Sequence, residues 1–576
     1  MKLRFFATIL TLIFMAGLMP VSQAEALDTV APGNADSDVI VVFNEDISTE
    51  EAEDKTGGQI DHFTAEAWNE DEAFIPEGQP VGVDTGGADL DEYIDSISQD
   101  ESVAFAQPNY KYTLDTNEWR ETSTNPYLLL EDRQWNLKYL NTQEAWNLID
   151  ALDRANTERV KIATIDTGIK IDHLDMTKNI DPQNCVKTVR GTMTYPYKPR
   201  FNHGMGVASI ICADSNNEIG ISGIAAGNHN DLISLFGVNV YRNKGHKSQA
   251  SVYTQDIIAG LEYADAAGAR IMNMSLSFFS NKYRKKGQIK HDDKALQMEM
   301  EKLDSEGVIV VCSAGNRAKM KTKYPSDYDT TISVMSSLHY KNAWVSVKRK
   351  NSNYGPKKTL CAPGTVIPAC GLKGGYQAAG STSAATPHVT AVAALMLAVD
   401  PNLSVDETRE ILCTTATDVN KEGRDLLTGY GMVNAYNAVA ETARRSAAKG
   451  TLRHPDGSQI TPEEVEKLIA ETKPAEEGGE SLKAPAVTVT AAAKKGMLIS
   501  WEIEKPAHLN YIKIYRAESE DGEYQLVQTI TKDRASWKDT KIKKNTSYYY
   551  KVCVLGTTSD GKKIWSPLSA PACQSE

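Results

Sequence analysis

The chain has 576 residues, of which 41% are hydrophobic and 24% are charged, and its formal net charge is −14 at pH 7. This length is more than one hydrophobic core organises, and it predicts about three or four folded units. The composition excludes a disordered chain and a chain that resides in a membrane, and the acidic surface argues against nucleic acid as the main partner.

Residues 1–24 have the order of a secretory signal peptide. Basic residues precede an apolar run over residues 5–18, and small residues follow, so that we expect cleavage after Ala24 or Ala26. The alternative, a transmembrane anchor, needs about 20 apolar residues, and Pro20 interrupts the run. No later apolar run in the sequence is long enough to span a bilayer. The sequence therefore predicts a secreted, extracellular product without a membrane span after signal removal.

Residues 36–115 are expected to form a small α+β unit. Residues 38–43 and 103–106 are apolar runs of strand length, and residues 90–97 have the spacing of a short amphipathic helix. Residues 115–126 are polar, as in an exposed connection that a protease can cut. A separate unit is thus predicted in front of the main domain.

Residues 125–445 are predicted to form an α/β domain. Continuous apolar runs rich in β-branched residues occur at residues 160–165, 270–275 and 308–312, and residues 294–304 have helical spacing. Such runs, separated by helices, indicate a parallel sheet with helices on both faces.

The composition changes after this domain. Residues 446–483 are rich in charge and poor in large apolar side chains, and we expect a linker with one short helix that begins at Thr461-Pro462. Residues 484–573 contain short alternating strands divided by turns, which predict an all-β sandwich.

The eight cysteines are scattered without a repeated spacing. Cys212 and Cys312 lie in apolar runs and are expected to be small buried residues. Two pairs, Cys361 with Cys370 and Cys553 with Cys573, are close enough in sequence for a disulfide to be considered, and the sequence leaves both open. No CxxC or His-rich cluster indicates zinc.

Three short segments carry side chains that could act together in catalysis. Asp166 closes a predicted strand, His203 opens an apolar helical stretch, and Ser383 precedes an alanine-rich helix. A serine hydroxyl is a poor nucleophile until an imidazole takes its proton, and a carboxylate holds that imidazole in the right tautomer. These three residue types therefore favour amide hydrolysis by a serine nucleophile.

A fourth requirement is a hydrogen-bond donor for the oxygen that becomes negative. Asn316 follows the strand predicted at residues 308–312, and its side-chain amide would act beside the backbone N–H of Ser383. Loss of such a donor typically lowers turnover by about 10²–10³. Each short motif alone matches often by accident and reads as an ordinary turn, so the argument depends on their order.

The order Asp166, His203, Asn316, Ser383, each in its own local phrase, resembles the subtilisin family of serine proteases, also called subtilases or peptidase family S8. The resemblance covers residues 135–440. It includes the Asp-Thr-Gly phrase and three further segments: Trp135-Asn136-Leu137, Asn353-Tyr354-Gly355 with Ala362-Pro363-Gly364, and Gly429-Tyr430-Gly431-Met432-Val433-Asn434-Ala435.

This resemblance implies a secreted serine endopeptidase with Asp166, His203 and Ser383 as its triad and Asn316 in the oxyanion hole. It implies that residues 36–115 are an inhibitory, fold-assisting propeptide that the enzyme removes by self-cleavage. Partners would be protein or peptide substrates and the chain's own propeptide. No cofactor is implied for the chemistry; structural calcium is common in the family, and no contiguous acidic loop here identifies a site. Residues 484–572 resemble a fibronectin type III module.

Two departures from the family pattern concern the triad phrases. Met205 and Gly206 stand where the family usually has Thr-His after the His-Gly phrase, and we expect changed packing rather than lost activity. Ser381 stands where the family usually has glycine, which admits close backbone approach, and this departure is expected to affect the rate.

A third departure concerns substrate binding. Ser275, Leu276, Ser277 and Phe278 stand where the family commonly has a Ser-Leu-Gly-Gly strand that pairs with substrate and walls the primary pocket. Ser277 and Phe278 could narrow this pocket and favour a small side chain at the cleavage position. Alternatively, Phe278 turns into the core.

Other polar residues are expected to be structural. Asp172, His173 and Asp175 could be mistaken for a metal cluster, but a turn after the Asp166 strand is the simpler interpretation. His388 is expected to be a packed histidine in the helix after Ser383.

The alternative function, from another class, is a secreted binding protein that keeps the protease fold with little catalysis and adheres through its C-terminal sandwich. The sequence also leaves open whether an active enzyme digests broadly or matures one dedicated partner.

Overall fold

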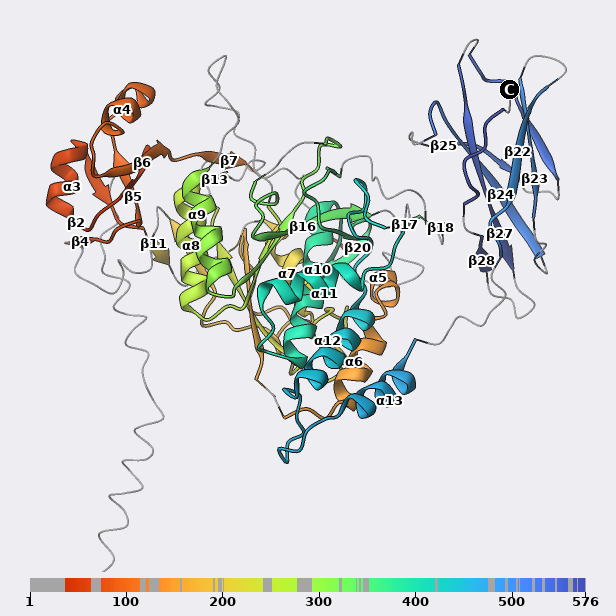
Figure 1. Ribbon diagram of the computed structural model, residues 1–576, viewed down its shortest axis with the longest axis horizontal. Coiled ribbons are helices and arrows are strands. Elements are labelled where there is room, and N and C mark those ends of the chain that lie inside the picture. The colour runs from red at the N-terminus through yellow and green to blue at the C-terminus, as the bar shows by residue number, and fades with distance from the viewer. Residues whose placement is uncertain are drawn as a thin grey trace, which may run out of the picture.

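The computed structural model (Figure 1) describes residues 37–574 apart from residues 64–73, 114–120, 124–133, 156–157, 190–191, 195–198, 200, 242–250, 277–292, 321–323, 338, 341–342, 345–351, 420–422, 475–481, 493–495, 504–505, 507, 521–523, 531–533, 544–545, 558–562 and 567. The described residues form three units in chain order: an N-terminal unit of residues 37–113, a central domain, and a C-terminal β unit that begins at residue 482. The predicted signal peptide lies outside the described residues.

The N-terminal unit is a small α+β fold. Its antiparallel sheet has the order β3-β5-β1-β6, with bounds Gln59–Asp61, Pro80–Asp84, Val39–Phe43 and Val103–Pro108. Helix α3 (Thr49–Thr56) begins where the Ser48 side chain accepts from the Glu51 N–H and ends at the left-handed Gly57. Helix α4 (Leu90–Ile97) is capped by Asp89, and β2 (Ile47–Ser48) pairs with β4 (Phe74–Ile75). The strands and the helix predicted for this unit are confirmed.

The central domain is built on an eight-stranded sheet. The strand order is β11 (Thr192–Thr194), β10 (Val186–Val189), β12 (Ile233–Asn239), β9 (Val160–Asp166), β14 (Ile271–Met274), β15 (Ile309–Ser313), β16 (Thr331–Ser337) and β19 (Leu360–Pro363). The seven strands from β10 to β19 are parallel, and β11 pairs with β10 in the antiparallel sense. The predicted parallel α/β sheet is confirmed.

Helices cover both faces of this sheet. Helices α7 (Asn202–Cys212) and α10 (Thr382–Val399) lie on one side, and α8 (Thr254–Ala266) and α9 (Lys294–Ser305) lie on the other (Figure 1). A second layer packs outside α10, and it comprises α5 (Trp135–Tyr139), α6 (Thr142–Ala151), α11 (Val405–Thr414), α12 (Ala435–Lys449) and α13 (Pro462–Thr472). Because both faces are covered, strands β14, β15, β16 and β19 are buried along their whole length and β9 and β12 at all but one residue, which explains their continuous apolar runs.

Helix α13 is integrated in the central domain, although a linker was expected over residues 446–483. The helix begins as predicted, with the Thr461 side chain accepting from the Glu464 N–H and proline in the first turn. Its Val465 and Ile469 are buried in the core of the central domain, and the hydroxyl of Tyr436 on α12 donates to the Ile469 carbonyl at 2.5 Å. Only these two side chains of the helix are buried, so the sequence pattern alone does not reveal that the helix belongs to the central domain.

Short strands connect the units and surround the domain. β7 (Lys111–Thr113) pairs with β13 (Ser251–Tyr253), and β8 (Glu121–Ser123) pairs with the hairpin of β20 (Ile367–Cys370) and β21 (Tyr376–Ala379). A further small hairpin joins β17 (His339–Tyr340) and β18 (Ala343–Trp344).

The C-terminal unit contains two antiparallel sheets. One has the order β22 (Ala486–Ala491), β23 (Met497–Glu502), β26 (Ser536–Asp539), and the other β25 (Gln525–Ile530), β24 (His508–Ala517), β27 (Tyr549–Thr557), β28 (Lys563–Trp565). Residues of both sheets share one hydrophobic cluster, with Ile499 and Trp501 from the first sheet and Ile514 and Tyr550 from the second. The predicted strands of this unit are confirmed.

All eight cysteines lie in the described part of the chain, and all are free. Neither pair that the spacing left open is bonded, and Cys212 and Cys312 are buried as expected. We expected no apolar run after the signal to be long enough for a membrane span, but within the described part of the chain α10 meets that length and composition. Every residue of this helix is buried inside the domain.

Candidate active site

Asp166, Ser275 and Asn316 meet at one edge of the central sheet. Strand β9 ends at Asp166, and β14 and β15 end one and three residues before Ser275 and Asn316. The three strands are parallel neighbours in the order β9-β14-β15. Their carboxyl ends therefore bring the three residues to one edge, where open parallel sheets place their ligands.

Asp166 and His203 are in direct contact. The His203 Nδ1 lies 2.8 Å from Oδ1 and 3.0 Å from Oδ2 of Asp166, and both side chains are completely buried. Because a carboxylate accepts, Nδ1 carries the hydrogen, and this fixes the tautomer whose Nε2 is the basic nitrogen.

Helix α7 is held against the end of β9, which brings His203 to Asp166. The Gly204 N–H donates to the Thr167 hydroxyl at 2.9 Å, and the Thr167 N–H donates to Asp166 Oδ1 at 2.6 Å. A Cβ atom at Gly204 would lie 2.6 Å from the Gly168 carbonyl oxygen, so only glycine permits this approach. Glycine at position 204 is thus a requirement of packing.

Ser383 lies in the first turn of α10, which packs against α7. Its hydroxyl donates to the carbonyl oxygen of Ser275 at 3.2 Å, and the Ser275 hydroxyl donates to the carbonyl oxygen of Ser383 at 2.9 Å. Both residues are buried. The nucleophile candidate is therefore tied to the end of β14 through two contacts.

Asn316 is fixed by the residue before Ser383. The Thr382 N–H and hydroxyl both donate to Asn316 Oδ1, at 3.1 and 2.8 Å. A backbone N–H can only donate, so this atom is the amide oxygen, and the amide nitrogen is the donor end of the side chain. The arrangement suits an oxyanion donor beside Ser383.

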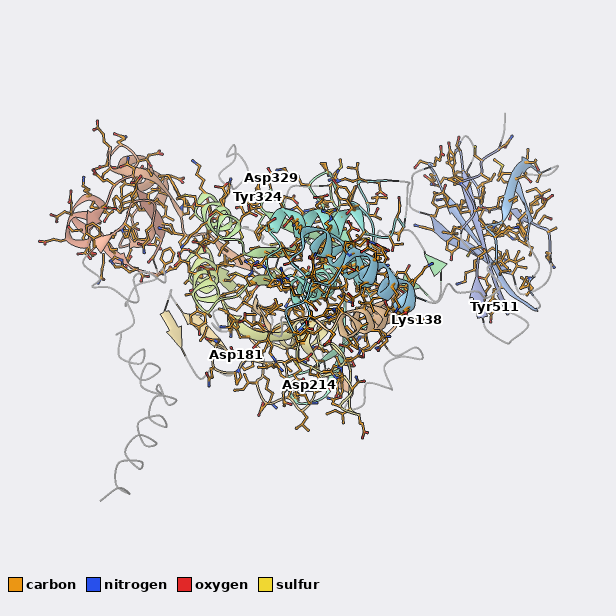
Figure 2. The ribbon with its side chains drawn as sticks, turned by 60° about the horizontal axis from the view of Figure 1, so that its bottom comes forward. Lys138, Asp181, Asp214, Tyr324, Asp329 and Tyr511 are labelled. Atoms are coloured by element: carbon orange, nitrogen blue, oxygen red, sulfur yellow. The ribbon has the colours of Figure 1, made fainter. Side chains whose placement is uncertain are left out.

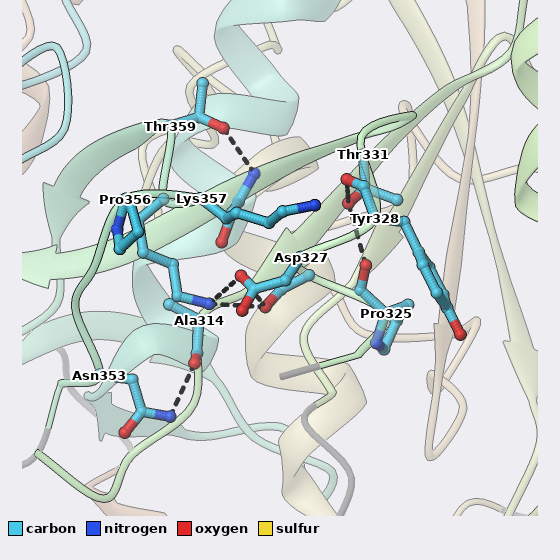
Figure 3. Close-up of polar contacts among 12 residues, drawn as sticks. Ala314, Pro325, Asp327, Tyr328, Thr331, Asn353, Pro356, Lys357 and Thr359 are labelled. Atoms are coloured by element: carbon cyan, nitrogen blue, oxygen red, sulfur yellow. Dashed lines mark hydrogen bonds and ion pairs between the residues drawn. The ribbon is translucent and has the colours of Figure 1, made fainter. Parts of the chain in front are cut away.

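The loop that carries Asn316 is clamped by Asn353 (Figure 3). The Asn353 amide nitrogen donates to the Ala314 carbonyl at 2.8 Å, and its oxygen accepts from the N–H groups of Arg317 and Lys319 at 3.1 and 3.2 Å. Its own N–H donates to the Gly315 carbonyl at 2.8 Å. One buried side chain therefore satisfies backbone groups on both sides of Asn316.

A buried ion pair lies near the same loop (Figure 3). The Lys358 ammonium contacts the Asp327 carboxylate and donates to the Ser326 hydroxyl at 3.0 Å. Burial lowers the pKa of Lys358, and Asp327 opposes that shift. Because a buried charge that loses its partner is costly, this pair fixes the segment at residues 324–328. Tyr324 of this segment and Asp214 lie on opposite sides of the central domain (Figure 2).

Comparison with known proteins identifies the family. Residues 157–431 match the subtilase family. A subtilisin of Bacillus pumilus is 31% identical over 290 residues, which span 49% of this chain and 90% of that protein. The chain belongs to the subtilase family.

Two other relatives extend the comparison of this subtilase. The minor extracellular protease Epr of Bacillus subtilis (strain 168) is 27% identical over 388 residues, 66% of this chain, and the chain spans 53% of that protein's length. Thermitase of Thermoactinomyces vulgaris is 27% identical over 325 residues, 55% of this chain and 99% of that protein. The matched segment is a subtilisin-like serine endopeptidase domain, and subtilases need no cofactor for catalysis.

The departures from the family phrases have distinct consequences in this subtilase. Met205 is completely buried, and its sulfur accepts from the Lys170 N–H at 3.4 Å, so it fills space beside the Asp166 loop. Ser381 adopts φ 77° and ψ −172°, a conformation that glycine adopts and serine rarely does. Ser277 and Phe278 lie outside the described residues.

The Asp175 carboxylate is the centre of a partly buried hydrogen-bond network. The Asp175 carboxylate accepts from the Asn217 amide at 2.8 Å, the Ile221 N–H at 2.8 Å and the Tyr376 hydroxyl at 3.3 Å. Burial raises the pKa of Asp175 to about 6. Among the described residues no group of three or more His, Cys, Asp or Glu side chains could hold a metal ion.

His173 and His388 are packed structural residues. The Asp175 N–H donates to His173 Nδ1 at 3.2 Å, which forms the turn expected after the Asp166 strand. His388 Nδ1 donates to the Ala384 carbonyl at 2.8 Å, and its Nε2 lies 3.0 Å from the Asn136 amide nitrogen. Burial lowers the pKa of His388 to about 4.

Two residues that support the site, Thr382 and Asn353, were not singled out from the sequence as functional. Thr382 adjoins Ser383, and Asn353 opens a family phrase, so both lay within recognised segments. Their hydrogen bonds join residues 66 and 34–39 positions apart, which no local pattern reveals.

Proposed function

We propose that this subtilase is a secreted serine endopeptidase that hydrolyses peptide bonds through Asp166, His203 and Ser383 and is activated by removal of residues 36–115. The observation that carries the proposal is the buried Asp166–His203 contact, which lies at the same sheet edge as Ser383 and Asn316. A carboxylate, an imidazole in a fixed tautomer, a serine and an amide donor are the groups that serine-catalysed acyl transfer requires.

The proposed reaction begins with proton transfer from Ser383 to His203. The Ser383 oxygen attacks the substrate carbonyl while His203 Nε2 takes the hydroxyl proton, and Asp166 stabilises the imidazolium that forms. His203 then gives this proton to the leaving amine, and an acyl-enzyme remains on Ser383. Water, deprotonated by the same imidazole, releases the acid and restores the serine.

The negative oxygen of each tetrahedral intermediate would be bound by Asn316 and the backbone N–H of Ser383. Thr382 orients the Asn316 amide nitrogen as the donor, and Asn353 fixes the loop that carries it. Donors held in advance stabilise developing charge without reorganisation at the moment of reaction.

Substrate would bind by strand addition along Ser275, Leu276, Ser277 and Phe278. Leu276 is buried, and the carbonyl of Ser275 accepts from the Ser383 hydroxyl, so the first residue of this segment lies beside the nucleophile. Ser277 and Phe278 are proposed to narrow the pocket for the side chain at the cleavage position.

The N-terminal unit is proposed to be the inhibitory propeptide. Strand β7, at its end, pairs with β13 of the central domain, directly before α8. Asn109 exchanges hydrogen bonds with Gln255 at 2.8 and 3.3 Å, and the Gln107 amide donates to Asp293, the N-cap of α9, at 2.9 Å. The added strand and these side-chain contacts hold the unit on the central domain, as an intramolecular inhibitor requires.

Three further assignments concern the signal peptide, the bounds of the catalytic domain and the C-terminal domain. Residues 1–24 are proposed to be a signal peptide. The Epr relative is named an extracellular protease, which supports this proposal. The catalytic domain is proposed to begin near residue 125 and to include α13, which packs on its core. Residues 484–573 are proposed to be a fibronectin type III-like domain, whose two sheets share one hydrophobic cluster.

The test follows the intact mass of the chain without residues 1–24, beside its Ser383→Ala variant, over several hours. We expect the parent to lose the segment before about residue 125 and the variant to stay whole. The processed parent should react with a fluorophosphonate at Ser383. Its peptide-library profile should favour small side chains at the cleavage position; a preference for large aromatic ones would contradict the narrowed pocket.

The alternative function, a binding protein with little catalysis, predicts a different result. A folded parent that stays whole, and that does not react with the fluorophosphonate even after trypsin has removed the N-terminal unit, would favour it. A parent that becomes reactive only after trypsin treatment would show an enzyme that another protease activates.

A further inference from the structure

Helix α10 lacks one of its own backbone hydrogen bonds at the nucleophile candidate. In an α-helix the carbonyl of each residue accepts from the N–H four positions later. The residue four positions after Ser383 is Pro387, which lies inside the helix and has no N–H. The Ser383 carbonyl therefore needs a donor from elsewhere, because an unpaired buried carbonyl is costly.

The Ser275 hydroxyl supplies this donor. It lies 2.9 Å from the Ser383 carbonyl oxygen, and both residues are about 1% exposed. Since a carbonyl oxygen only accepts, the hydrogen of Ser275 must point at Ser383. The Ser275 hydroxyl can then only accept from its other polar neighbour.

That neighbour is Asn273, and it extends the chain of hydrogen bonds. The Asn273 amide nitrogen donates to the Ser275 oxygen at 3.0 Å, so the amide oxygen faces Thr390, whose hydroxyl donates to it at 2.8 Å. Asn273 and Thr390 are completely buried. The direction of every bond follows from the single acceptor at the end, the Ser383 carbonyl.

We propose that Ser275 is a positioning residue for the nucleophile: its hydroxyl, oriented by Asn273 and Thr390, replaces the helical hydrogen bond that Pro387 removes from Ser383. This inference rests on the proposed function, because it concerns the geometry of Ser383 as a nucleophile. The Ser275 side chain thus faces Ser383, and only the backbone of Ser275 can form hydrogen bonds with a bound substrate.

The reciprocal contact explains why this bond affects catalysis. The Ser383 hydroxyl donates to the Ser275 carbonyl. The backbone and the side chain of Ser383 are therefore both hydrogen-bonded to Ser275, the residue that follows β14. Without the Ser275 hydroxyl, the first turn of α10 has an unsatisfied carbonyl beside the reacting oxygen. A small displacement there lowers turnover without changing how substrate binds.

The test compares Ser275→Ala, Pro387→Ala and the double variant with the parent in the full chain. After processing, kcat and KM are measured on a peptide substrate, together with the rate constant of fluorophosphonate labelling. Ser275→Ala should lower kcat and the labelling constant about tenfold with KM unchanged. Adding Pro387→Ala should restore most of both, because the new N–H at position 387 satisfies the Ser383 carbonyl from within the helix.

Ser446→Ala is the matched control. It removes another buried serine hydroxyl, which donates to Asp400 at 2.6 Å at the opposite end of α10, and it should leave kcat and labelling unchanged. The inference is overturned if Ser275→Ala keeps the parent's kcat, or if its loss is equal with and without Pro387→Ala.

Two further comparisons keep the outcome decisive. If Ser275→Ala does not fold, Thr390→Val, which keeps the shape of the side chain and removes the first donor, should lower kcat by a smaller factor; an unchanged kcat would contradict the proposal. A parent that never labels, like Ser383→Ala, would instead refute the proposed function itself.

Discussion

Ser381 holds a backbone conformation that few residues other than glycine adopt. Its φ of 77° and ψ of −172° lie in a region where the Cβ atom crowds the backbone. Its hydroxyl is buried and has no hydrogen-bond partner among the described residues. The Ser381 N–H donates to the Gly364 carbonyl at 2.7 Å, and its neighbour Thr382 holds Asn316, so the strained residue is fixed from both sides.

Ser381→Gly should therefore stabilise the protein. Relief of the strained conformation is worth about 1–3 kcal/mol, and the greater freedom of glycine in the unfolded chain costs about 0.4–1 kcal/mol, so we expect a net gain of about 1 kcal/mol. Denaturant unfolding, measured in a Ser383→Ala background to prevent self-digestion, checks this expectation.

Asn216→Gly is the control for that measurement. Asn216 has a φ of 52°, in the left-handed region that asparagine tolerates, so its replacement should change stability by only a few tenths of a kcal/mol. An equal effect at both positions would show that the gain does not come from strain at Ser381.

At the scale of elements, His388 joins α10 to α5. Its Nδ1 donates to Ala384 within α10, and its Nε2 accepts from the Asn136 amide. A second proton on the imidazole would point at a donor, so the bridge exists only in the neutral form. Burial accordingly lowers the pKa of His388 to about 4.

Acid should reduce the stability that this bridge provides, beginning near the pKa of a free imidazole. The unfolded pKa is about 6.5 and the folded one about 4, so the stability from neutral His388 is complete above about pH 6.5 and is lost as the pH falls toward 4. The loss is about 3 kcal/mol. Unfolding of Ser383→Ala and Ser383→Ala/His388→Gln from pH 4 to 8 should show a shallower pH dependence in the second; parallel curves would contradict this.

Asp175 changes the pH dependence of stability in the opposite direction to His388. Burial raises its pKa to about 6, so its contribution is complete below about pH 4 and is lost as the pH rises through 6. The two groups therefore oppose each other between pH 4 and 6. Asp175→Asn in the same background should make the acid loss steeper, whereas His388→Gln makes it shallower.

The elements that carry the site could be predicted from sequence, and the contacts between them could not. Strand β9 and helices α9 and α10 follow from continuous apolar runs and helical spacing, and the resemblance supplied the roles of Asp166, His203 and Ser383. Helix α13 was assigned to a linker because only two of its side chains, Val465 and Ile469, are buried. The contribution of Asn353 depends on which loop lies opposite, which is a property of the folded sheet.

Pro387 shows that some of the missing information was present locally. A proline four residues after a predicted nucleophile in a helix implies that the nucleophile's carbonyl lacks its helical donor. The identity of the replacement, Ser275, requires the parallel order of β14 beside β9 and the position of α10 over both.

At the scale of the whole molecule, the N-terminal unit and the central domain share a buried polar network. Asn109 bonds both to Gln255 of α8 and, within its own unit, to the Ser37 carbonyl at 3.0 Å. Gln255 also donates to Asp61 at 2.6 Å, so three segments of the chain meet at this residue. The network is polar, and each bond in it must be re-formed by water when the units separate.

Asn109→Ala should weaken the hold of the N-terminal unit after self-cleavage. The substitution leaves the amide of buried Gln255 partly unsatisfied, which costs about 1–3 kcal/mol and corresponds to about a tenfold or greater loss of affinity. In gel filtration of the processed full chain, the cleaved unit should co-elute with the parent domain and separate from the variant, whose peptidase activity should appear sooner.

Asn44→Ala is the matched control for this experiment. The Asn44 amide donates to the Glu101 carbonyl at 2.6 Å within the N-terminal unit and makes an exposed contact. It should leave co-elution and the onset of activity unchanged. Separation of the unit in both variants would mean that instability of the unit, and not the shared network, is responsible.

The distribution of the thiols also matters for handling the protein. Seven of the eight cysteines are wholly or partly buried, and burial raises the pKa of the partly exposed Cys413 to about 11, whereas Cys573 in the C-terminal unit is exposed. A maleimide at neutral pH therefore has one ready point of attachment. A surface coupled there would hold every molecule by the same residue of its β unit and leave the peptidase domain chemically unmodified.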